Sequence, residues 1–318
     1  MSAPEVTVVV VVKDRRERML RCLDALLAQD HPSYEVLVVD NGSSDGTPEA
    51  VLARAAEQPG RGEDGREPVG VRIERATGSL GHARNAGAAA ARGRLVAFTD
   101  SDCEAEPAWL RRLTAAFADP EVGVATGSTL PAEPPPYGDW YATIEITEQT
   151  WRFETCNAAY RRQALVEGPG FHEGVTMWED TAAGWGALRA GWRPVFVAGA
   201  VVRHDVTYPG YRWHLRRVFR YGEGAAVLRD HPQMRERVLF ARVFHRPRDV
   251  RVVAAAAGLA LSRLDRRALL LAAPYAYHRR PRTLHPWAAV GLAQMVGIDL
   301  AILAGMVRGS LRWRRLIL

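Results

Sequence analysis

The stretch RLVAFTDSDCEAEPAWLRRL, from Arg94 to Leu113, decides how this chain is interpreted. Its apolar run Leu95–Phe98 leads into two aspartates, Asp100 and Asp102, that are separated by a single residue. Two carboxylates so close together repel each other unless positive charge lies between them. They are therefore either solvated turn residues or ligands of a cation, and the rest of the chain must discriminate between these alternatives.

The residues around this stretch alternate between strand and helix patterns. Continuous apolar, often β-branched runs predict strands buried on both faces, and apolar residues three or four positions apart predict helices. The predicted strands are Val6–Val12, Glu35–Val39, Val69–Glu74 and Leu95–Thr99, and the predicted helices are Glu17–Gln29, one capped by Thr47 with Pro48 in its first turn, and Gly81–Arg92. This alternation is typical of an α/β fold with a parallel sheet.

Acidic residues follow two of these strands. Ligands of parallel α/β sheets bind beyond the carboxyl ends of the strands, and Asp40 and Asp100 both fall at such ends. No GxGxxG follows the first strand, and no GxxxxGK[ST] occurs in the sequence. The usual glycine-rich signatures of dinucleotide and P-loop phosphate binding are therefore missing.

Four segments of the chain resemble, in their order, glycosyltransferase family 2, a family with the GT-A fold. The segments include VVDNGSSDGT, GHARNAG, TDSDC and MWEDT, and the resemblance extends over roughly residues 5–205. It implies a Rossmann-like, parallel-sheet GT-A domain that binds a nucleotide-sugar over residues 1–210, followed by a mostly α-helical, basic region over residues 211–318.

The resemblance also implies roles on the donor side. Asp100–Ser101–Asp102 resembles the DxD motif, in which Asp102 is the metal ligand and Asp100 approaches the ribose. The metal would be Mg²⁺ or Mn²⁺, because these hard cations prefer oxygen ligands. Asp40 resembles the aspartate that contacts the base, and Arg84 and Asn85 resemble a segment near the donor. His204 stands where many members have a histidine that helps to bind the metal or the diphosphate.

Each of these donor-side residues has an alternative structural role. Asp40 could be an Asx-type turn residue. Arg84 and Asn85 could belong to an ordinary helix surface, and a single histidine after a strand, such as His204, is usually structural.

The segment MWEDT supplies most of the candidate residues on the acceptor side of the site. In the family the aspartate of this pair is the catalytic base, which implies that Asp180 removes the proton of the attacking acceptor hydroxyl. Trp178 and Glu179 beside it, and Asn157 in TCNAAYRR, are placed on the acceptor side by the same resemblance. Acids at the start of a helix also complement the helix dipole, so a structural role for this pair is open as well.

The sequence departs from the family pattern at two places, and these departures limit which activities are expected. VVKDR replaces the commoner Pro-x-Tyr-Asn-type end of the first strand, which leaves the nucleotide contacts there undefined. Pro209 occupies the place of the glutamine in the QxxRW motif of processive synthases. A processive polysaccharide synthase is therefore not expected.

The charges of the chain are divided unequally. From Ala200 onward there are 22 arginines against 7 acidic residues, a balance of +15, whereas the first 199 residues carry −9. A basic region of this kind can meet nucleic acid or an anionic membrane surface. Nucleic acid would not explain the ordered acids of the first half, so an anionic membrane is the expected partner and no nucleic acid is expected.

The basic region contains two segments that favour a membrane surface. Arg212, Arg216 and Arg220 fall on one helical face, which could meet phosphates or bilayer or be solvated. Pro286–Val307 is long enough to span a bilayer, but a central aspartate, here Asp299, opposes insertion by about 3 kcal/mol. The segment is therefore expected to lie in or against the membrane, or to be buried under protein.

The cysteines agree with a cytoplasmic location. Cys22, Cys103 and Cys156 are odd in number and widely spaced, which predicts neither a disulfide framework nor a zinc site. We therefore expect a cytoplasmic protein that is peripheral at the inner face of the cell membrane.

The function expected from the sequence is that of an inverting, metal-dependent glycosyltransferase that moves a sugar from a nucleotide diphosphate-sugar donor to an acceptor hydroxyl. A nucleotidyltransferase is one alternative, although VVKDRRERM lacks the glycine-rich phosphate loop that such an enzyme should have. A non-catalytic, membrane-associated scaffold with the same fold is the other alternative.

Overall fold

The computed structural model describes residues 3–58, 68–280 and 288–318. The chain divides into two compact units, residues 1–137 with 142–207 and residues 138–141 with 208–318. The boundary expected at residue 210 thus lies three residues from the division at residue 207. The short segment Gly138–Tyr141 groups with the second unit, where the Trp140 ring contacts the Tyr211 ring at a tilt, with centroids 4.9 Å apart.

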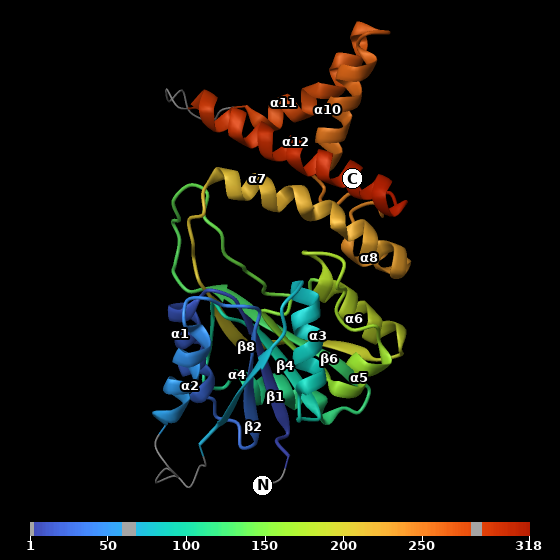
Figure 1. The fold of residues 1–318 in the computed structure, drawn as a ribbon. Coiled ribbons are helices and arrows are strands. Elements are labelled where there is room, and N and C mark those ends of the chain that lie inside the picture. The colour runs from blue at the N-terminus through green and yellow to red at the C-terminus, as the bar shows by residue number, and fades with distance from the viewer. Residues whose placement is uncertain (1–2, 59–67, 281–287) are drawn as a thin grey trace. The chain divides into compact units, whose positions relative to one another are not determined.

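Among the described residues of the first unit, eight strands form one sheet in the order β3-β2-β1-β4-β7-β6-β8-β5 (Figure 1). The strands are β1 (Val6–Val12), β2 (Tyr34–Asp40), β3 (Gly70–Arg75), β4 (Leu95–Asp100), β5 (Cys103–Ala105), β6 (Val122–Pro131), β7 (Asn157–Arg161) and β8 (Arg193–His204). The first four strands are parallel neighbours, which confirms the prediction for the front half. β7 is antiparallel to both β4 and β6, so the sheet as a whole is mixed and not parallel throughout.

The helices of the first unit follow the predicted alternation. They are α1 (Arg16–Leu27), α2 (Thr47–Ala56), α3 (Leu80–Ala90), α4 (Trp109–Ala115), the 3-10 turn η1 (Ala116–Ala118), α5 (Arg162–Glu167) and α6 (Glu179–Arg189). The prediction that Thr47 caps α2 is wrong: Gly46, with φ of 78°, holds that position. Thr47 is instead the first helical residue, and its N–H and hydroxyl both donate to Asp45.

Both faces of β1 are covered by helices, as its unbroken run of valines predicts. Val8 and Val10 belong to the same buried cluster as Leu23 of α1. Val9 points to the opposite face, where a methyl group on Gly87 of α3 would lie 2.6 Å from its side chain. In Figure 1, α1 and α2 accordingly lie on one side of the sheet and α3 on the other.

The strand register brings the acidic motifs to one edge of the sheet. β1 lies between β2 and β4, with Val12 opposite Asp40 and Val11 opposite Asp100. After a short turn the chain enters β5, which pairs with β8 so that Cys103 is opposite His204. Asp102, one residue before that pair, is thereby carried next to the end of β8.

The regular structure described in the second unit is mainly helical. The α-helices are α7 (Tyr211–Phe219), α8 (Gly224–Asp230), α9 (Arg235–Val238), α10 (Asp249–Leu261), α11 (Ala273–Arg279) and α12 (Ala288–Trp313), and the 3-10 helices are η2 (Arg220–Glu223), η3 (Pro232–Met234) and η4 (Arg266–Ala272). Arg212 and Arg216 are exposed on α7, whereas Arg220 is half-buried and already belongs to η2.

The apolar C-terminal segment forms α12, although Pro286 and Trp287 lie outside the described residues. Among these residues, Ala289–Trp313 is the one helix that is long and apolar enough to cross a membrane, a criterion that core helices of soluble proteins also meet. Asp299 is 2% exposed, and both of its oxygens accept from Arg279, at 2.6 and 2.8 Å. The negative charge of Asp299 is therefore neutralised by Arg279 inside the second unit. A central aspartate is thus compatible with the otherwise apolar helix α12.

α12 packs closely on the helical segment that contains Phe219 and Gly222. Met306 is fully buried on this helix, and Gly305 and Gly309 lie at the crossing. A methyl group on Gly305 would lie 2.1 Å from the Phe219 carbonyl oxygen. α12 is consequently part of the core of the second unit, so deleting it would remove packing as well as any anchor.

Replacing Gly305 by alanine should destabilise the second unit. The added methyl group has no room, and overpacking of a tight core typically lowers the free energy of unfolding by about 1–3 kcal/mol. Gly291→Ala in the same helix is the control, since its methyl group meets nothing within 4 Å and alanine favours a helix by up to about 1 kcal/mol. Thermal unfolding followed by circular dichroism would measure both variants. A midpoint for Gly305→Ala equal to that for Gly291→Ala would contradict the close crossing.

Candidate active site

Arg84 holds two of the predicted acidic motifs together. It is 5% exposed on α3, and its guanidinium pairs with Asp100 at 3.1 Å and, through its other terminal nitrogen, with Glu179. Burial alone would lower the pKa of this guanidinium, but the surrounding carboxylates, led by Glu179, raise it above its usual value. The guanidinium therefore keeps its charge, and it joins the end of β4 to the start of α6.

Asp180, next to this ion pair, has the environment expected of a proton acceptor. Burial first, and then the neighbouring Glu179 carboxylate, raise the pKa of Asp180 well above its ordinary value. Its Oδ1 accepts the Thr181 N–H at 2.7 Å, which fixes the carboxylate at the helix start. A carboxylate with a raised pKa holds a proton more readily than a solvated one, which suits a general base.

The turn that carries this pair is strained. Trp178 precedes α6 with φ of 74°, a left-handed conformation that non-glycine residues rarely adopt. Its ring is 7% exposed and lies under the Arg152 guanidinium, 5.1 Å from the ring centroid. Backbone strain of this kind tends to occur at functional sites, where surrounding packing maintains it.

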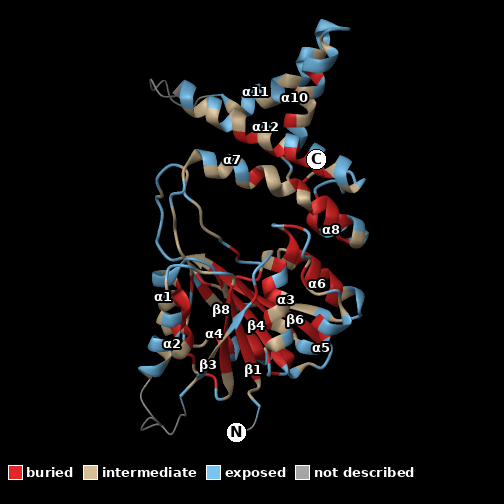
Figure 2. Ribbon diagram, viewed as in Figure 1, coloured by how far each residue is buried: buried red, intermediate tan, exposed pale blue. Residues whose placement is uncertain are grey.

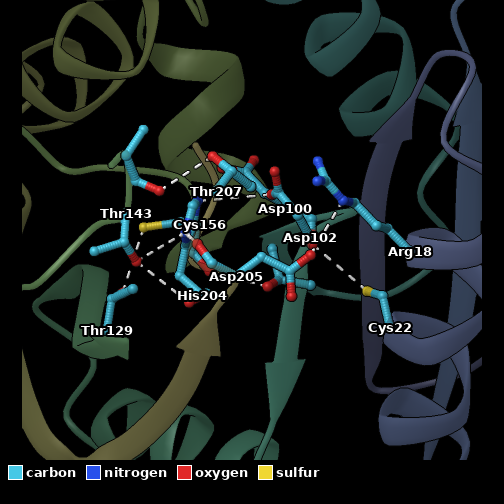
Figure 3. A network of polar contacts seen from close by, with 12 residues as sticks. Arg18, Cys22, Asp100, Asp102, Thr129, Thr143, Cys156, His204, Asp205 and Thr207 are labelled. Atoms are coloured by element: carbon cyan, nitrogen blue, oxygen red, sulfur yellow. Dashed lines mark hydrogen bonds and ion pairs between the residues drawn. The ribbon is translucent and has the colours of Figure 1, made fainter. Parts of the chain in front are cut away.

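Asp102 and His204 form a second group beside the first. The His204 Nε2 atom lies 3.7 Å from Asp102 Oδ1, and Figure 3 shows both side chains beside Asp205. The His204 Nδ1 atom lies 2.8 Å from the Asp205 carbonyl oxygen, to which it can only donate. In the neutral imidazole this leaves the lone pair on Nε2, directed toward Asp102.

This group fits a divalent cation. Asp102, Cys103 and His204 offer ligand atoms that all lie within 4.8 Å of one another. Two atoms that each lie about 2.1 Å from one Mg²⁺ ion can be 3.7 Å apart, as the Asp102 and His204 atoms are. Mg²⁺ and Mn²⁺ prefer oxygen to sulfur, so Asp102 and His204 are the residues that suit it chemically.

Arginines in and just before α1 contact Asp102 and the neighbouring Asp205, and the sequence did not predict these contacts. Arg15 pairs with Asp102 at 2.5 Å, and Arg18 and Arg21 pair with Asp205 at 3.1 and 2.9 Å. The three arginines recur every third residue, a helical spacing that could have indicated a shared face. Arg15 is half-exposed, so its side chain can leave Asp102 when another cation binds there.

The segment that replaces the usual end of the first strand is fixed to the loop after β2. Asp14 has φ of 49°, and its carboxylate accepts the Ser44 N–H at 2.7 Å. Asp45 in turn accepts the Arg16 N–H at 3.0 Å. The departure from the family pattern is thus accommodated by a different set of loop contacts.

Two further donor-side residues are mainly engaged in local structure. Asp40 is 4% exposed and accepts the Ser43 N–H at 3.0 Å, which is the Asx-type turn that the alternative describes. The Asn85 amide bonds the Phe171 backbone in both directions, at 2.8 and 2.9 Å, and donates to Glu173. Asn85 therefore holds the loop before α6, and its amide is not directed at a donor.

Asn157 is placed in the core. It is 1% exposed, accepts from the Trp109 indole at 2.8 Å, and donates to the carbonyl oxygens of Ser128 and Ala200. These bonds join β7 to β6, β8 and α4, so the structure gives the Asn157 side chain a role in the core. Glu179 is likewise buried and paired with Arg84, which gives it a structural role beside Asp180.

Acids at the ends of parallel strands and at the start of α6, on a mixed sheet of this topology, define a glycosyltransferase site of the GT-A class. The chain belongs to glycosyl transferase family 2, whose model matches residues 7–174.

Curated relatives agree with this family. The chain is similar to glycosyltransferase AglE of Haloferax volcanii, 35% identical over 129 residues that make up 40% of each chain. It is also similar to the succinoglycan biosynthesis protein ExoO of Rhizobium meliloti, 39% identical over 112 residues that make up 35% of this chain and 29% of ExoO. The chain thus spans less than half the length of these two relatives.

Solved structures share the fold. The mannosyltransferase PcManGT from Pyrobaculum calidifontis, in complex with GDP-Man and Mn²⁺, superposes with a TM-score of 0.56 at 22% identity, over 97% of this chain and 88% of that one. S. aureus TarS 1-349 in complex with UDP-GlcNAc gives 0.51 at 16% identity, over 98% and 92%. At these identities the likeness concerns the fold.

Replacing Arg84 by methionine should destabilise the first unit strongly. Asp100 and Glu179 would then lie close together without a counter-charge, and removing one partner of a buried ion pair typically costs about 3–5 kcal/mol. Arg84→Lys keeps the charge without the forked geometry and should fall between the variant and the wild type. Arg111→Gln removes an exposed pair with Asp30 and is the control, with little change expected. Urea unfolding would measure all three, and an unchanged midpoint for Arg84→Met would contradict the structural role.

Proposed function

We propose that the chain is an inverting, metal-dependent glycosyltransferase that transfers a sugar from a nucleotide diphosphate-sugar to an acceptor hydroxyl. The observation that supports this most is the Arg84 bridge. It joins Asp100 at the end of β4 to Glu179 at the start of α6, the residue next to the proposed base. A donor held at Asp100 and an acceptor deprotonated at Asp180 would then share one site.

The reaction is a single displacement at the anomeric carbon. The acceptor hydroxyl gives its proton to the Asp180 carboxylate as its oxygen bonds to the anomeric carbon. The bond from that carbon to the diphosphate oxygen breaks, and its electrons leave with the nucleotide diphosphate. One in-line displacement inverts the configuration of the carbon.

The other proposed residues bind the donor. Asp40 and Asp100 would contact the base and the ribose at the ends of β2 and β4. Asp102 and His204 would hold Mg²⁺ or Mn²⁺, which when bound supplies positive charge to the diphosphate oxygens. Arg15 and Arg18 lie at the same edge and add positive charge near the place where the diphosphate would lie.

No observation favours a nucleotidyltransferase, since the family and the relatives are those of glycosyltransferases. A non-catalytic scaffold would not need a base with a raised pKa, and the two variants below distinguish it from an enzyme. We further propose a cytoplasmic location at the inner face of the membrane, supported by the three cysteines, which are free and buried, and by the +15 charge of the second part of the chain.

Asp102→Asn should weaken the Mn²⁺-dependent binding of nucleotide diphosphates. The amide keeps the shape of the side chain but loses the charge that holds the cation, so the fold should be retained. Calorimetry with UDP and GDP, each with and without Mn²⁺, would measure this. Glu106→Gln, which removes an acid paired with Arg203, is the control. Unchanged metal-dependent affinity in Asp102→Asn would remove Asp102 from the metal site.

Asp180→Asn should abolish most of the transfer while leaving donor binding and folding near normal. Loss of a general base typically lowers the rate by about 10²–10⁴-fold, whereas asparagine still serves at a helix start. In the wild type the rate should fall as the pH drops through the raised pKa of Asp180, because the protonated carboxyl cannot accept a proton.

Transfer rate and Mn²⁺-dependent donor affinity are therefore measured together on this variant. Wild-type transfer would refute the role as base and leave Asp180 as a helix-start residue. A joint loss of transfer and donor affinity would instead assign Asp180 to the metal site.

A further inference from the structure

The hairpin formed by α10 and η4 in the second unit exposes large apolar side chains. Leu264 is 86% exposed, Leu270 73% and Leu259 61%. None of the described residues of η4 and α11 is buried. Figure 2 shows the exposed residues of the hairpin gathered at the turn between α10 and η4. In Figures 1 and 2 this turn extends beyond α11 and α12. Leucines this exposed and this close together mark an interaction surface.

Arginines surround the same turn. Arg263, Arg266 and Arg267 are all exposed, and no ion pair involves them within the described part of the chain. The acid among them, Asp265, accepts the Arg267 N–H at 2.9 Å and so is engaged in starting η4. The turn therefore combines apolar side chains with a positively charged rim.

The combination of exposed leucines and exposed arginines favours an anionic lipid surface over a second copy of the chain as the partner. A second copy of the chain would cover the leucines, but it would also bring the arginines of two turns together, which is repulsive. An anionic lipid surface offers negative charge along the rim and an apolar interior for the leucines.

We propose that the α10–η4 turn, residues 259–271, is the surface by which the chain binds an anionic bilayer. The leucines enter the boundary between headgroups and acyl chains, and the arginines bind lipid phosphates. This inference rests on the membrane location proposed above and names the residues that make the contact. It assigns the contact to α10 and η4, whereas α12, to which the sequence pointed, packs one face in the core through Ile298, Ile302 and Met306.

The test is sedimentation of the full chain with vesicles of phosphatidylcholine alone and of phosphatidylcholine with phosphatidylglycerol. Wild-type protein should bind the anionic vesicles and lose binding at high salt. Arg263→Gln with Arg266→Gln should lower the partition coefficient roughly 30-fold on anionic vesicles. Leu264→Gln with Leu270→Gln should lower it by about tenfold or more.

A matched control removes the same residue types elsewhere. Leu52→Gln with Arg54→Gln takes one exposed leucine and one exposed arginine from α2 and should bind like the wild type. Far-ultraviolet circular dichroism and thermal unfolding verify that every variant is folded. Mn²⁺-dependent binding of UDP and GDP, measured on the same samples, shows independently whether the proposed donor site is present.

Three results would overturn the proposal. Wild-type protein could fail to bind anionic vesicles, or both turn variants could bind as well as the control. The wild type could also prove to be an oligomer that the leucine variant dissociates, in which case the turn is a contact between copies. Each result would leave the transferase proposal standing if metal-dependent nucleotide binding were retained.

Discussion

The buried pairing of Arg84 with Asp100 and Glu179 is the constraint on which the rest of the site depends. One guanidinium neutralises carboxylates from motifs that are almost eighty residues apart in sequence. Its forked geometry allows it to serve both at once, which a lysine could not do. Asp180, the next acid along α6, has no ion pair with this guanidinium, and burial followed by the Glu179 carboxylate raises its pKa. The positive charge of Arg84 opposes this rise only in part.

A similar competition governs the other acidic group. Asp102 lies between the Arg15 guanidinium and the His204 imidazole, and both approach it from different elements. The hydrogen bond from His204 Nδ1 to the Asp205 carbonyl oxygen leaves Nε2 as the ring nitrogen that faces Asp102, where a cation could contact it. Such a cation would compete with Arg15 for one carboxylate. The released guanidinium would then lie beside the negative charge that a diphosphate brings, which couples metal binding to donor binding by simple electrostatics.

Sequence patterns predicted the features that depend on local residues. The valine run of β1 and the acid that ends β4 are recognisable because burial on both faces and strand-end position leave marks in consecutive residues. Contacts between distant segments leave no such mark. The pairing of Arg21 with Asp205 spans 184 residues, and Asn157 was indistinguishable from a ligand until its three partners in the core were known. Composition likewise could not separate a core helix from a membrane helix, and the Arg279 and Tyr275 partners of Asp299 show how α12 accommodates its charge.

The unequal distribution of charge along the chain can be explained by the needs of the candidate site and of a membrane surface. The first 199 residues are acidic overall, and the carboxylates of the candidate site need a cation to accept a diphosphate. An anionic bilayer repels such a unit, so a chain of this composition can work at a membrane only if another part supplies the attraction. The arginines after Ala200 would supply it under the proposal above, and those at the α10–η4 turn have no acidic partners of their own within the described residues. Attraction and catalysis would then rest on different residues, so either could change without disturbing the charges that the other requires.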